Sequence, residues 1–565
     1  MVQHFLNEVK IPSAKFMISS MKNSDSQLRL DQMYTTSFQQ NWELPLFTDY
    51  GGETFTFEYV ARRIEALKIT MSEAGLKPGD KIAIYARNSS NWATTFFSIM
   101  AFEGVVVPIL PDFTPENALH ILKHSGAKVL FVADSLYSNL DKSKLKELKL
   151  CISTDDFRIL NKKSKSSPEF AIDDSLNVEK QNFSFPKREE EDLFILSYTS
   201  GSMGFSKGVM LPVRSIESNI IYAREHMPLK AGDRIVSILP MAHIFGLAFE
   251  NMFPVTLGCH ITFLTKVPTP QILLKALGEV KPNLILLVPL IIEKIYKKRI
   301  VPTLEKPVMK TLLAIPGIRN LIYKKTRKSL IESFGGNFLE AVVGGAALSP
   351  EVEAFFRKIR FPFTIGYGMT ECGPLISYAP HNETKKGSSG KLVDRMDVRI
   401  DSNNPYEVAG EIQVRGRNVM LGYYKNEKVN AQAFTDDGWL KTGDLGIIDK
   451  EKFIYIKGRK KNMLLGPSGQ NVYPEELESR LTNFPIVQEC VIIQRNNRLV
   501  AKIYPDSEMM TNAGLDEDDL DDILEKTRQA FNKAVASYEQ LSGIELVDQE
   551  FEKTPKKNIK RFLYT

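Results

Sequence analysis

The sequence has few cysteines, little net charge and no long apolar run. Its four cysteines, Cys151, Cys259, Cys372 and Cys490, lie far apart without metal-ligand spacing, so neither a disulfide framework nor a cysteine-based metal site is expected. The net charge of +5 is small for 565 residues and gives a nucleic-acid partner no support. The longest aliphatic run, Leu284–Ile292, is far shorter than the roughly 20 residues that span a bilayer. We therefore expect it to be a buried strand or core helix.

The beginning of the sequence also lacks the apolar segment of a secretory signal, so we expect a cytoplasmic protein. Hydrophobic residues make up 43% and charged residues 25% of the chain, which is typical of a globular protein. Because 565 residues are too many for one core, we expect more than one domain.

Helical and strand-like stretches alternate from about residue 54, and this alternation predicts parallel sheets covered by helices on both faces. After about residue 390 the pattern changes to short strands with turns, and from about Arg459 a last segment has helices and strands of its own. The predicted fold class is α/β. We expect a large N-terminal domain of stacked α/β sheets over residues 1–457, with a β-rich subdomain at about 390–457, and a small mobile α+β C-terminal domain over residues 458–565.

A loop rich in glycine, hydroxyl groups and lysine, SYTSGSMGFSKG, spans Ser197–Gly208. It fails the P-loop pattern, because Ser206 replaces the second glycine and Gly208 follows the lysine. Glycines still allow backbone N–H groups to approach a phosphate, and Lys207 supplies a positive charge. Taken alone, the stretch fits a flexible surface loop equally well, since Gly/Ser-rich segments usually are that.

Four further motifs follow this loop. They are GGAALS at 344–349, IGYGMTECGP at 365–374, GWLKTGDLG at 438–446 and KGRKKNMLLGPSGQNVYPEELE at 457–478. With the loop, they make the sequence resemble the adenylate-forming superfamily of acyl-CoA synthetases, peptide-synthetase adenylation domains and beetle luciferases. The five motifs occur in the family's order and spacing. The segments NVYPEELE and FEKTPKKNIKRFLYT make it most similar to bacterial long-chain fatty-acid–CoA ligases.

The resemblance implies a reaction in two halves. A fatty-acid carboxylate attacks the α-phosphate of ATP and gives an acyl-adenylate and pyrophosphate. Coenzyme A then displaces AMP and forms a thioester. Because an anion attacks a polyanion in the first half, the site must supply cations and aligned donors. The expected ligands are ATP, Mg²⁺, coenzyme A and a fatty acid, and no nucleic acid.

The resemblance also assigns roles around the nucleotide. Glu371 is expected to bind Mg²⁺, which prefers oxygen ligands, and Thr370 to hydrogen-bond the α-phosphate. Asp444 is expected to bind the ribose hydroxyls with the help of Arg459. The phosphate loop is expected to cover the β- and γ-phosphates through Thr199, Ser200, Gly201, Ser202, Gly204 and Lys207. The residues expected near the adenine are Tyr367, Gly344, Gly345, Ala346, Gly366 and Gly368. Outside this context, a lone Glu is commonly a solvated charge and a Tyr after Gly is commonly core.

Other positions concern the acyl group and coenzyme A. His243 matches a position near the acyl carboxylate, although a single His among apolar neighbours is more often packed core. The acyl tunnel is expected along 243–260 and 340–376. Lys461 matches the hinge on which the C-terminal domain swings, and Gly469 matches the loop that lines the pantetheine channel.

Three residues depart from the family pattern. Met203 stands where threonine is usual, Ser206 where proline is usual, and Asn558 where the family has a lysine that enters the site during adenylation. We expect Lys557 to take that catalytic role, with Lys560 second. The departures leave alternatives open: a fatty-acyl-AMP ligase that loads a carrier protein, an aryl-CoA ligase, or a non-catalytic acyl- or nucleotide-binding homologue.

Basic residues gather between Lys294 and Lys328. This stretch has eleven Lys or Arg residues and one acid, Glu305, with apolar residues between them. Such a pattern suits an anionic membrane surface, so we expect peripheral contact with the inner face of the membrane. The alternative is a solvated helical face.

Overall fold

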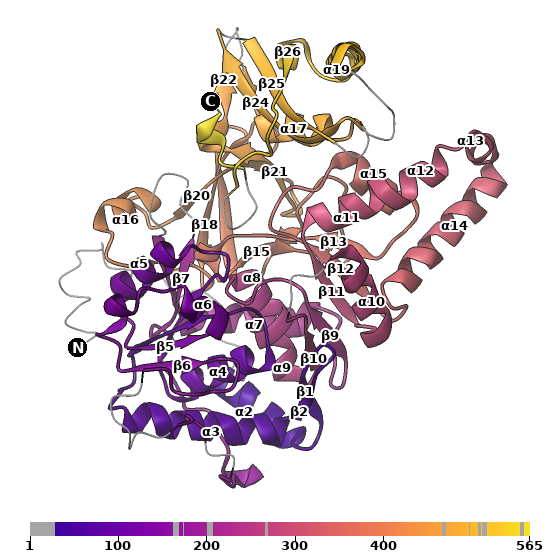
Figure 1. Cartoon of the computed structure of the whole chain (residues 1–565). Coiled ribbons are helices and arrows are strands. Elements are labelled where there is room, and N and C mark those ends of the chain that lie inside the picture. The colour runs from indigo at the N-terminus through magenta and orange to yellow at the C-terminus, as the bar shows by residue number, and fades with distance from the viewer. Residues whose placement is uncertain are drawn as a thin grey trace.

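The computed structural model describes residues 29–161, 169–172, 175–199, 207–265, 269–465, 470–496, 498–506, 510, 517–553 and 559–564. Figure 1 shows two layered sheets with their helices in the lower part of the view and a smaller unit, which carries the end of the chain, at the top. The predicted α/β class, with a large N-terminal and a smaller C-terminal domain, is confirmed.

The first large sheet has the strand order β19-β8-β7-β4-β3-β5-β6. Pairing is parallel from β7 to β6 and antiparallel at β8 and β19. Along β3, Ile82 and Ile84 face a core shared with α3 and α4, whereas Ala83 and Tyr85 face a core shared with α5. This two-sided burial is what helices on both faces of a parallel sheet produce.

The strands of this sheet are β3 (Lys81–Tyr85), β4 (Val105–Ile109), β5 (Val129–Val132), β6 (Leu150–Ser153), β7 (Leu193–Thr199), β8 (Lys207–Pro212) and β19 (Gly422–Tyr423). Its accompanying helices are α3 (Phe57–Glu73), α4 (Ser90–Ala101), α5 (Pro115–Ser125), α6 (Asp134–Ser138) and the short 3₁₀ turns η1 (Lys142–Leu145) and η2 (Lys180–Asn182).

The second large sheet has the order β13-β12-β11-β9-β10-β1-β2 and is parallel except at β2. One hydrophobic core joins the two sheets, since it contains Ile84 and Val106 of the first, Ile261 and Leu286 of the second, and Ile220 of α7. The aliphatic run Leu284–Ile292 divides into buried strand β11 and the start of helix α11.

The strands of the second sheet are β1 (Pro45–Asp49), β2 (Thr54–Thr56), β9 (Arg234–Ser237), β10 (His260–Phe263), β11 (Leu284–Leu287), β12 (Glu340–Val343) and β13 (Phe363–Ile365). The helices of this region are α2 (Leu30–Gln40), α7 (Val213–His226), α8 (Ile244–Gly246), the π-helical η3 (Leu247–Met252), α9 (Phe253–Leu257), α10 (Pro270–Val280), α11 (Pro289–Ile295), the π-helical η4 (Tyr296–Ile300), α12 (Val301–Leu304), α13 (Pro307–Ala314), α14 (Pro316–Ser333) and α15 (Pro350–Lys358).

Two small antiparallel sheets follow. The first contains β14 (Tyr367–Gly368), β15 (Leu375–Tyr378) and β16 (Lys391–Leu392), with the 3₁₀ turn η5 (Thr370–Cys372) between its first two strands. The second contains β17 (Met396–Asp401), β18 (Gly410–Gly416), β20 (Leu440–Ile448) and β21 (Ile454–Arg459), with helix α16 (Glu427–Ala433). Strand β21 runs through residues 457 and 458, and the exact domain boundaries stay a prediction.

The C-terminal part has its own hydrophobic core, which includes Leu477, Ile492, Ala501 and Phe531. Its elements are η6 (Lys460–Asn462), β22 (Leu464–Leu465), β23 (Asn471–Val472), α17 (Pro474–Leu481), β24 (Val487–Arg495), β25 (Arg498–Pro505), α19 (Glu517–Lys533), η7 (Ser537–Glu539), β26 (Leu541–Leu546) and η8 (Arg561–Leu563). Where it meets the large domain, Ser349 Oγ donates a hydrogen bond of 2.7 Å to Asn483 Oδ1 and Lys297 Nζ donates to the carbonyl of Thr482.

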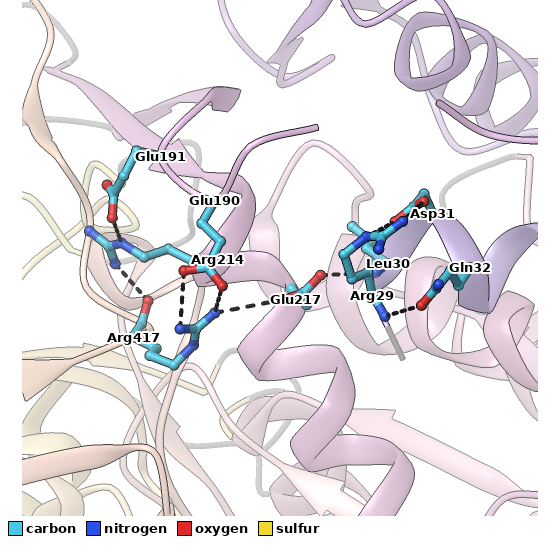
Figure 2. A network of polar contacts seen from close by, with 9 residues as sticks. All are labelled: Arg29, Leu30, Asp31, Gln32, Glu190, Glu191, Arg214, Glu217 and Arg417. Carbon is cyan, nitrogen blue, oxygen red and sulfur yellow. Dashed lines mark hydrogen bonds and ion pairs between the residues drawn. The ribbon is translucent and has the colours of Figure 1, made fainter. Parts of the chain in front are cut away.

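A polar network fastens distant segments together (Figure 2). Arg214, at the start of α7, donates from Nη1 to the carbonyl oxygens of Arg417 and Val419, both at 2.7 Å, and from Nε to Glu191. Further along α7, Glu217 accepts from the backbone N–H of Leu30 at 2.9 Å. The network therefore holds the segment between β18 and β19 against α7, and α7 against the start of α2.

We expect Arg214→Met to destabilise the protein by about 1–3 kcal/mol, because it leaves two backbone carbonyls without their donor at a site where the side chain is 16% exposed. Urea unfolding followed by far-UV circular dichroism measures the change. The matched control is Arg87→Met, whose pair with Asp112 is exposed on both sides and is expected to contribute at most about 1 kcal/mol. Equal losses in the two variants would contradict the prediction.

Candidate active site

A buried tyrosine, an aspartate and an arginine form one cluster. Asp444 on β20 pairs in register with Arg459 on β21, and Arg459 Nε lies 2.8 Å from Asp444 Oδ1. From β14, Tyr367 donates its hydroxyl to Asp444 Oδ2 at 2.7 Å. Burial raises the pKa of Asp444, and the Arg459 guanidinium and the Tyr367 hydroxyl oppose that rise. The cluster thus presents a carboxylate whose oxygens can accept further hydrogen bonds from hydroxyl groups.

A second cluster surrounds Glu371 in η5. Its side chain is 9% exposed, Oε1 accepts the hydroxyl of Tyr423 at 2.8 Å, and its backbone carbonyl accepts from the N–H of Met420 at 2.8 Å. Lys207 Nζ lies 5.1 Å from the centre of the Tyr423 ring. Tyr423 therefore links the expected metal ligand to the lysine of the phosphate loop. A carboxylate oxygen is the type of donor that Mg²⁺ takes in proteins, so the residue fits that ion.

The two clusters belong to one centre. Tyr367 of the first cluster, on β14, and Glu371 of the second, in η5, are four residues apart, and the charge of Glu371 acts with burial to raise the pKa of Asp444. Thr199 is the register partner of Lys207 across the β7–β8 pair, so the two ends of the phosphate loop meet at this centre. Thr370 is half-buried beside Glu371. Six elements thus bring together seven sequence-predicted residues: Thr199, Lys207, Tyr367, Thr370, Glu371, Asp444 and Arg459.

Glycines crowd the neighbouring strand ends. Gly344 and Gly366 follow the parallel strands β12 and β13, and a Cβ on Gly344 would lie 3.0 Å from the ring of Phe245. Gly345 has a φ of +86°, a conformation that favours glycine, and it is exposed together with Ala346. On β14, a Cβ on Gly368 would overlap the carbonyl oxygen of Pro374. Of the expected adenine-side residues, Gly345, Ala346 and Gly368 are therefore the exposed ones.

His243 is half-buried at the beginning of α8. Two polar side chains fix the segment before it. Buried Glu250 accepts through Oε2 the N–H of Ile238 at 3.0 Å and of Leu239 at 2.9 Å, and half-buried Asn88 accepts through Oδ1 the N–H of Met241 at 2.9 Å. Because α8 also carries Phe245, which packs on Gly344, this segment lies beside the glycine edge. The acyl tunnel itself stays a prediction.

Lys461 lies in η6, directly after Arg459 and Lys460. Burial and the charge of Arg459 lower the pKa of Lys461, and Lys207 and Arg561 contribute in the same direction. Arg561 is held by Glu478, with Nη2 2.6 Å from Oε1, and its side chain is 16% exposed. Lys560 Nζ lies 3.0 Å from Glu552 Oε2. The described end of the chain is thus anchored, and Arg561 is no part of a solvated basic tail.

Several predicted positions lie outside the described residues, and their roles stay predictions. They are Ser200, Gly201, Ser202, Met203, Gly204 and Ser206 of the phosphate loop, Gly469, and Lys557 with Asn558.

Sequence reasoning named neither Tyr423 nor Asn88, and it included Phe245 and Glu250 only within the expected tunnel stretch 243–260. Most of their contact partners are distant in sequence, and no motif in the sequence indicates these contacts. Only Tyr423 carried a local signal, as the first of two tyrosines that follow Gly422.

Comparison with known proteins decides the family. A protein-family model described as "AMP-binding enzyme" matches residues 35–424. The chain belongs to this family of adenylate-forming ligases. A long-chain-fatty-acid–CoA ligase of Mycobacterium bovis is 30% identical over 468 residues, which cover 77% of this chain and 74% of that protein.

Solved structures of this family share the fold. An o-succinylbenzoate CoA synthetase of Bacillus subtilis in complex with its acyl-adenylate intermediate has a TM-score of 0.73 at 20% identity, covering 94% of this chain and 98% of that one. The same enzyme in complex with ATP and a magnesium ion has a TM-score of 0.72 at 20% identity, with 94% and 98% covered. Among the helices of the described residues, none combines the length and the apolar character that a membrane span requires.

We expect Gly368→Ala to destabilise the chain by about 1–3 kcal/mol, because the added methyl group meets backbone rather than a side chain that can turn away. Since β14 carries Tyr367, AMP binding is also expected to weaken. Urea unfolding and titration calorimetry with AMP measure the two effects.

The matched control is Gly278→Ala in helix α10. A Cβ there meets no atom within 4 Å, and alanine favours a helix over glycine by roughly 0.5–1 kcal/mol. This variant is expected to bind AMP normally and to be at least as stable as the parent. Unchanged AMP binding and stability in Gly368→Ala would show that β14 can move without cost.

Proposed function

We propose that this protein joins a fatty acid to coenzyme A in an ATP-dependent reaction that releases AMP and pyrophosphate. The observation that carries the proposal is the presence of two buried acids near each other: Asp444 pairs with Arg459, and Glu371 accepts the hydroxyl of Tyr423, whose ring lies beside Lys207. The kind of acid is inferred from the relatives named as long-chain-fatty-acid–CoA ligases.

In the first half-reaction, the proposed role of Asp444 is to accept hydrogen bonds from the 2′- and 3′-hydroxyls of the ribose. Arg459 and Tyr367 hold its carboxylate from the protein side, so its orientation is set before the nucleotide arrives. The exposed backbone of Gly345 and Ala346 is the proposed neighbour of the adenine.

Lys207, Thr370 and Glu371 are proposed to offset the negative charge of the ATP phosphates. Lys207 faces the β- and γ-phosphates from the end of the phosphate loop, and Thr370 donates to the α-phosphate. Glu371 would hold Mg²⁺, which neutralises phosphate charge when it is bound. Tyr423 donates to one oxygen of Glu371 and so directs the carboxylate. Together these groups lower the repulsion that the attacking carboxylate meets.

The second half-reaction requires the thiol of coenzyme A to reach the acyl-adenylate. We propose that the C-terminal domain turns about Lys461 to admit it, with Gly469 along the pantetheine path and His243 near the acyl carboxylate. Such a turn would break the contacts of Lys297 with Thr482 and of Ser349 with Asn483. Two alternatives remain: transfer to a carrier-protein thiol, and activation of an aromatic acid. An assay that compares coenzyme A with a carrier protein tests the first, and one that compares fatty with aromatic acids tests the second.

The purified protein is expected to release AMP and pyrophosphate from ATP when a long-chain fatty acid is present, and to form the thioester when coenzyme A is added. Glu371→Gln is expected to slow adenylation by about 10²–10³-fold, because it removes one charge from the metal position while its amide oxygen can still accept from Tyr423. Pyrophosphate release and chromatography of the nucleotides measure both results.

The matched control is Glu427→Gln, which removes an exposed carboxylate at the start of α16 and is expected to leave the rate unchanged. ADP in place of AMP would refute the reaction type. A Glu371→Gln rate equal to the parent at limiting Mg²⁺ would remove Glu371 from the metal site but leave the proposed reaction intact.

We further predict that Lys557→Ala slows acyl-adenylate formation at least about tenfold, because an ammonium stabilises developing negative charge better than a neutral donor. Thioester formation from preformed acyl-adenylate is expected to remain nearly unchanged. Asn558→Lys is expected not to slow adenylation. Single-turnover assays of the two half-reactions measure these rates separately.

Lys560→Ala is the internal comparison, because the ammonium of Lys560 already pairs with Glu552. If Lys557→Ala and Lys560→Ala both adenylate at the parent rate, neither lysine is catalytic. That result would favour the reading of this chain as a slow enzyme or a non-catalytic homologue, to which Asn558 points.

A further inference from the structure

Helices α12, α13 and α14 form an arm that projects from the large domain. In Figure 1, α13 lies at the right-hand edge, farther out than α10 and α11, and α14 returns toward α10. No residue from 301 to 329 is buried, and the structure describes all of them. We call residues 301–329 the basic arm.

Among the described residues, side chains at the beginning of the basic arm and on α14 pack against the large domain, and we call these two places its roots. On the outgoing side, Val301 and Leu304 are partly buried against the core of the large domain. On the returning side, Tyr323 packs edge-on against Phe355, with ring centres 6.5 Å apart, and Lys358 Nζ lies 5.3 Å from its ring centre. Between these roots the helices are exposed to solvent over much of their surface.

Apolar side chains stand exposed on this arm. Val308 is 73% exposed, Leu321 68% and Ile315 46%. A single exposed aliphatic residue is ordinary, but these three lie close together along the arm: Val308 on α13, Ile315 between α13 and α14, and Leu321 on α14. Most of the surface of Val308 and Leu321 is left uncovered by the described chain.

Positive charge accompanies the apolar area. Residues 305–328 contain seven Lys or Arg residues and one acid, Glu305. On α14, Leu321, Lys324, Lys325 and Lys328 have the spacing i, i+3, i+4, i+7, which places them on one helix face, and all four are exposed. The exposed Leu321 therefore shares one face of α14 with three lysines.

The exposed basic surface is shorter than the basic stretch Lys294–Lys328 that the sequence analysis singled out. Tyr296 and Ile300 are buried. Lys297 turns toward the C-terminal domain, where its ammonium donates to the carbonyl of Thr482, and burial lowers its pKa. The outward-facing basic and apolar surface therefore begins only after residue 300.

We propose that the basic arm docks on an anionic lipid bilayer. Lysines can reach the headgroups while their methylene stems and the neighbouring Leu321 and Val308 enter the acyl boundary. A second copy of the chain would bring like charges together, and a nucleic acid would satisfy the lysines but leave the apolar residues without a partner. A lipid bilayer with anionic headgroups and an apolar interior fits both the lysines and the exposed apolar side chains. This match holds whether or not the protein catalyses the proposed acyl transfer.

The test is sedimentation of the full-length chain with vesicles of phosphatidylcholine alone or mixed with phosphatidylglycerol. Binding is expected to the mixed vesicles, to be weak to phosphatidylcholine alone, and to fall as salt screens the charges. The triple variant Lys324→Gln, Lys325→Gln, Lys328→Gln is expected to bind the mixed vesicles about 100-fold more weakly, since each lysine contributes about fivefold.

The apolar half is tested with Val308→Ser combined with Leu321→Ser, which is expected to weaken binding by at least about tenfold. The matched charge control is Lys144→Gln, Lys146→Gln, Lys428→Gln, which removes three exposed lysines elsewhere. The matched apolar control is Val408→Ser, at a residue 55% exposed. Both controls are expected to bind like the parent.

Equal recovery with both kinds of vesicle, or a loss as large in the controls as in the arm variants, would overturn the proposal. So would binding to duplex DNA that depends on the lysines together with vesicle binding that does not, because the arm would then be a nucleic-acid surface. A concentration-dependent dimer that Leu321→Ser abolishes, without vesicle binding, would show that a second copy covers the arm.

Discussion

The burial of carboxylates beside one another is the constraint on which this structure depends. Asp444 is 5% exposed and Glu371 9% exposed, and the desolvation of such groups costs free energy unless they find donors or cations. Arg459, Tyr367 and Tyr423 supply them. Because these partners come from β14, β19 and β21, the site exists only when the first large sheet and both small sheets are assembled.

The scaffold around Glu371 shows how that assembly is held. Asn219 on α7 donates to the carbonyl of Cys372 at 3.0 Å and accepts from the N–H of Leu375 at 2.9 Å. Asn418 donates to the carbonyl of Leu375 at 2.7 Å, and Arg214 fixes the backbone on both sides of Asn418. Side chains thus satisfy the backbone groups of an irregular turn that no sheet ladder could satisfy.

Part of the fold and of the candidate site could be predicted from local sequence patterns. The alternation of helix and strand predicted the α/β class. The family resemblance assigned Asp444 and Arg459 to the ribose, but it did not predict that antiparallel strands β20 and β21 would pair the two residues. The sequence did not show that Tyr423 would meet Glu371 or that Phe245 would cover Gly344, because those contacts depend on the order of strands in the sheets rather than on local propensity. Lys297 was likewise not predictable from local sequence. Its sequence context assigned it to the exposed basic stretch, whereas in the structure its ammonium donates to the carbonyl of Thr482 in the C-terminal domain.

The same electrostatics connect the nucleotide site to the interface between the domains. Burial lowers the pKa of Lys461, and the charges of Arg459, Lys207 and Arg561 lower it further, which means that cations from the large domain and from the C-terminal end repel one another there. A polyphosphate among them would replace repulsion with attraction on every side. If the C-terminal domain moves as proposed, binding of a polyanion and the position of that domain would influence each other reciprocally. In the proposed reaction, release of pyrophosphate would remove part of that attraction and would favour separation of the groups that the triphosphate draws together.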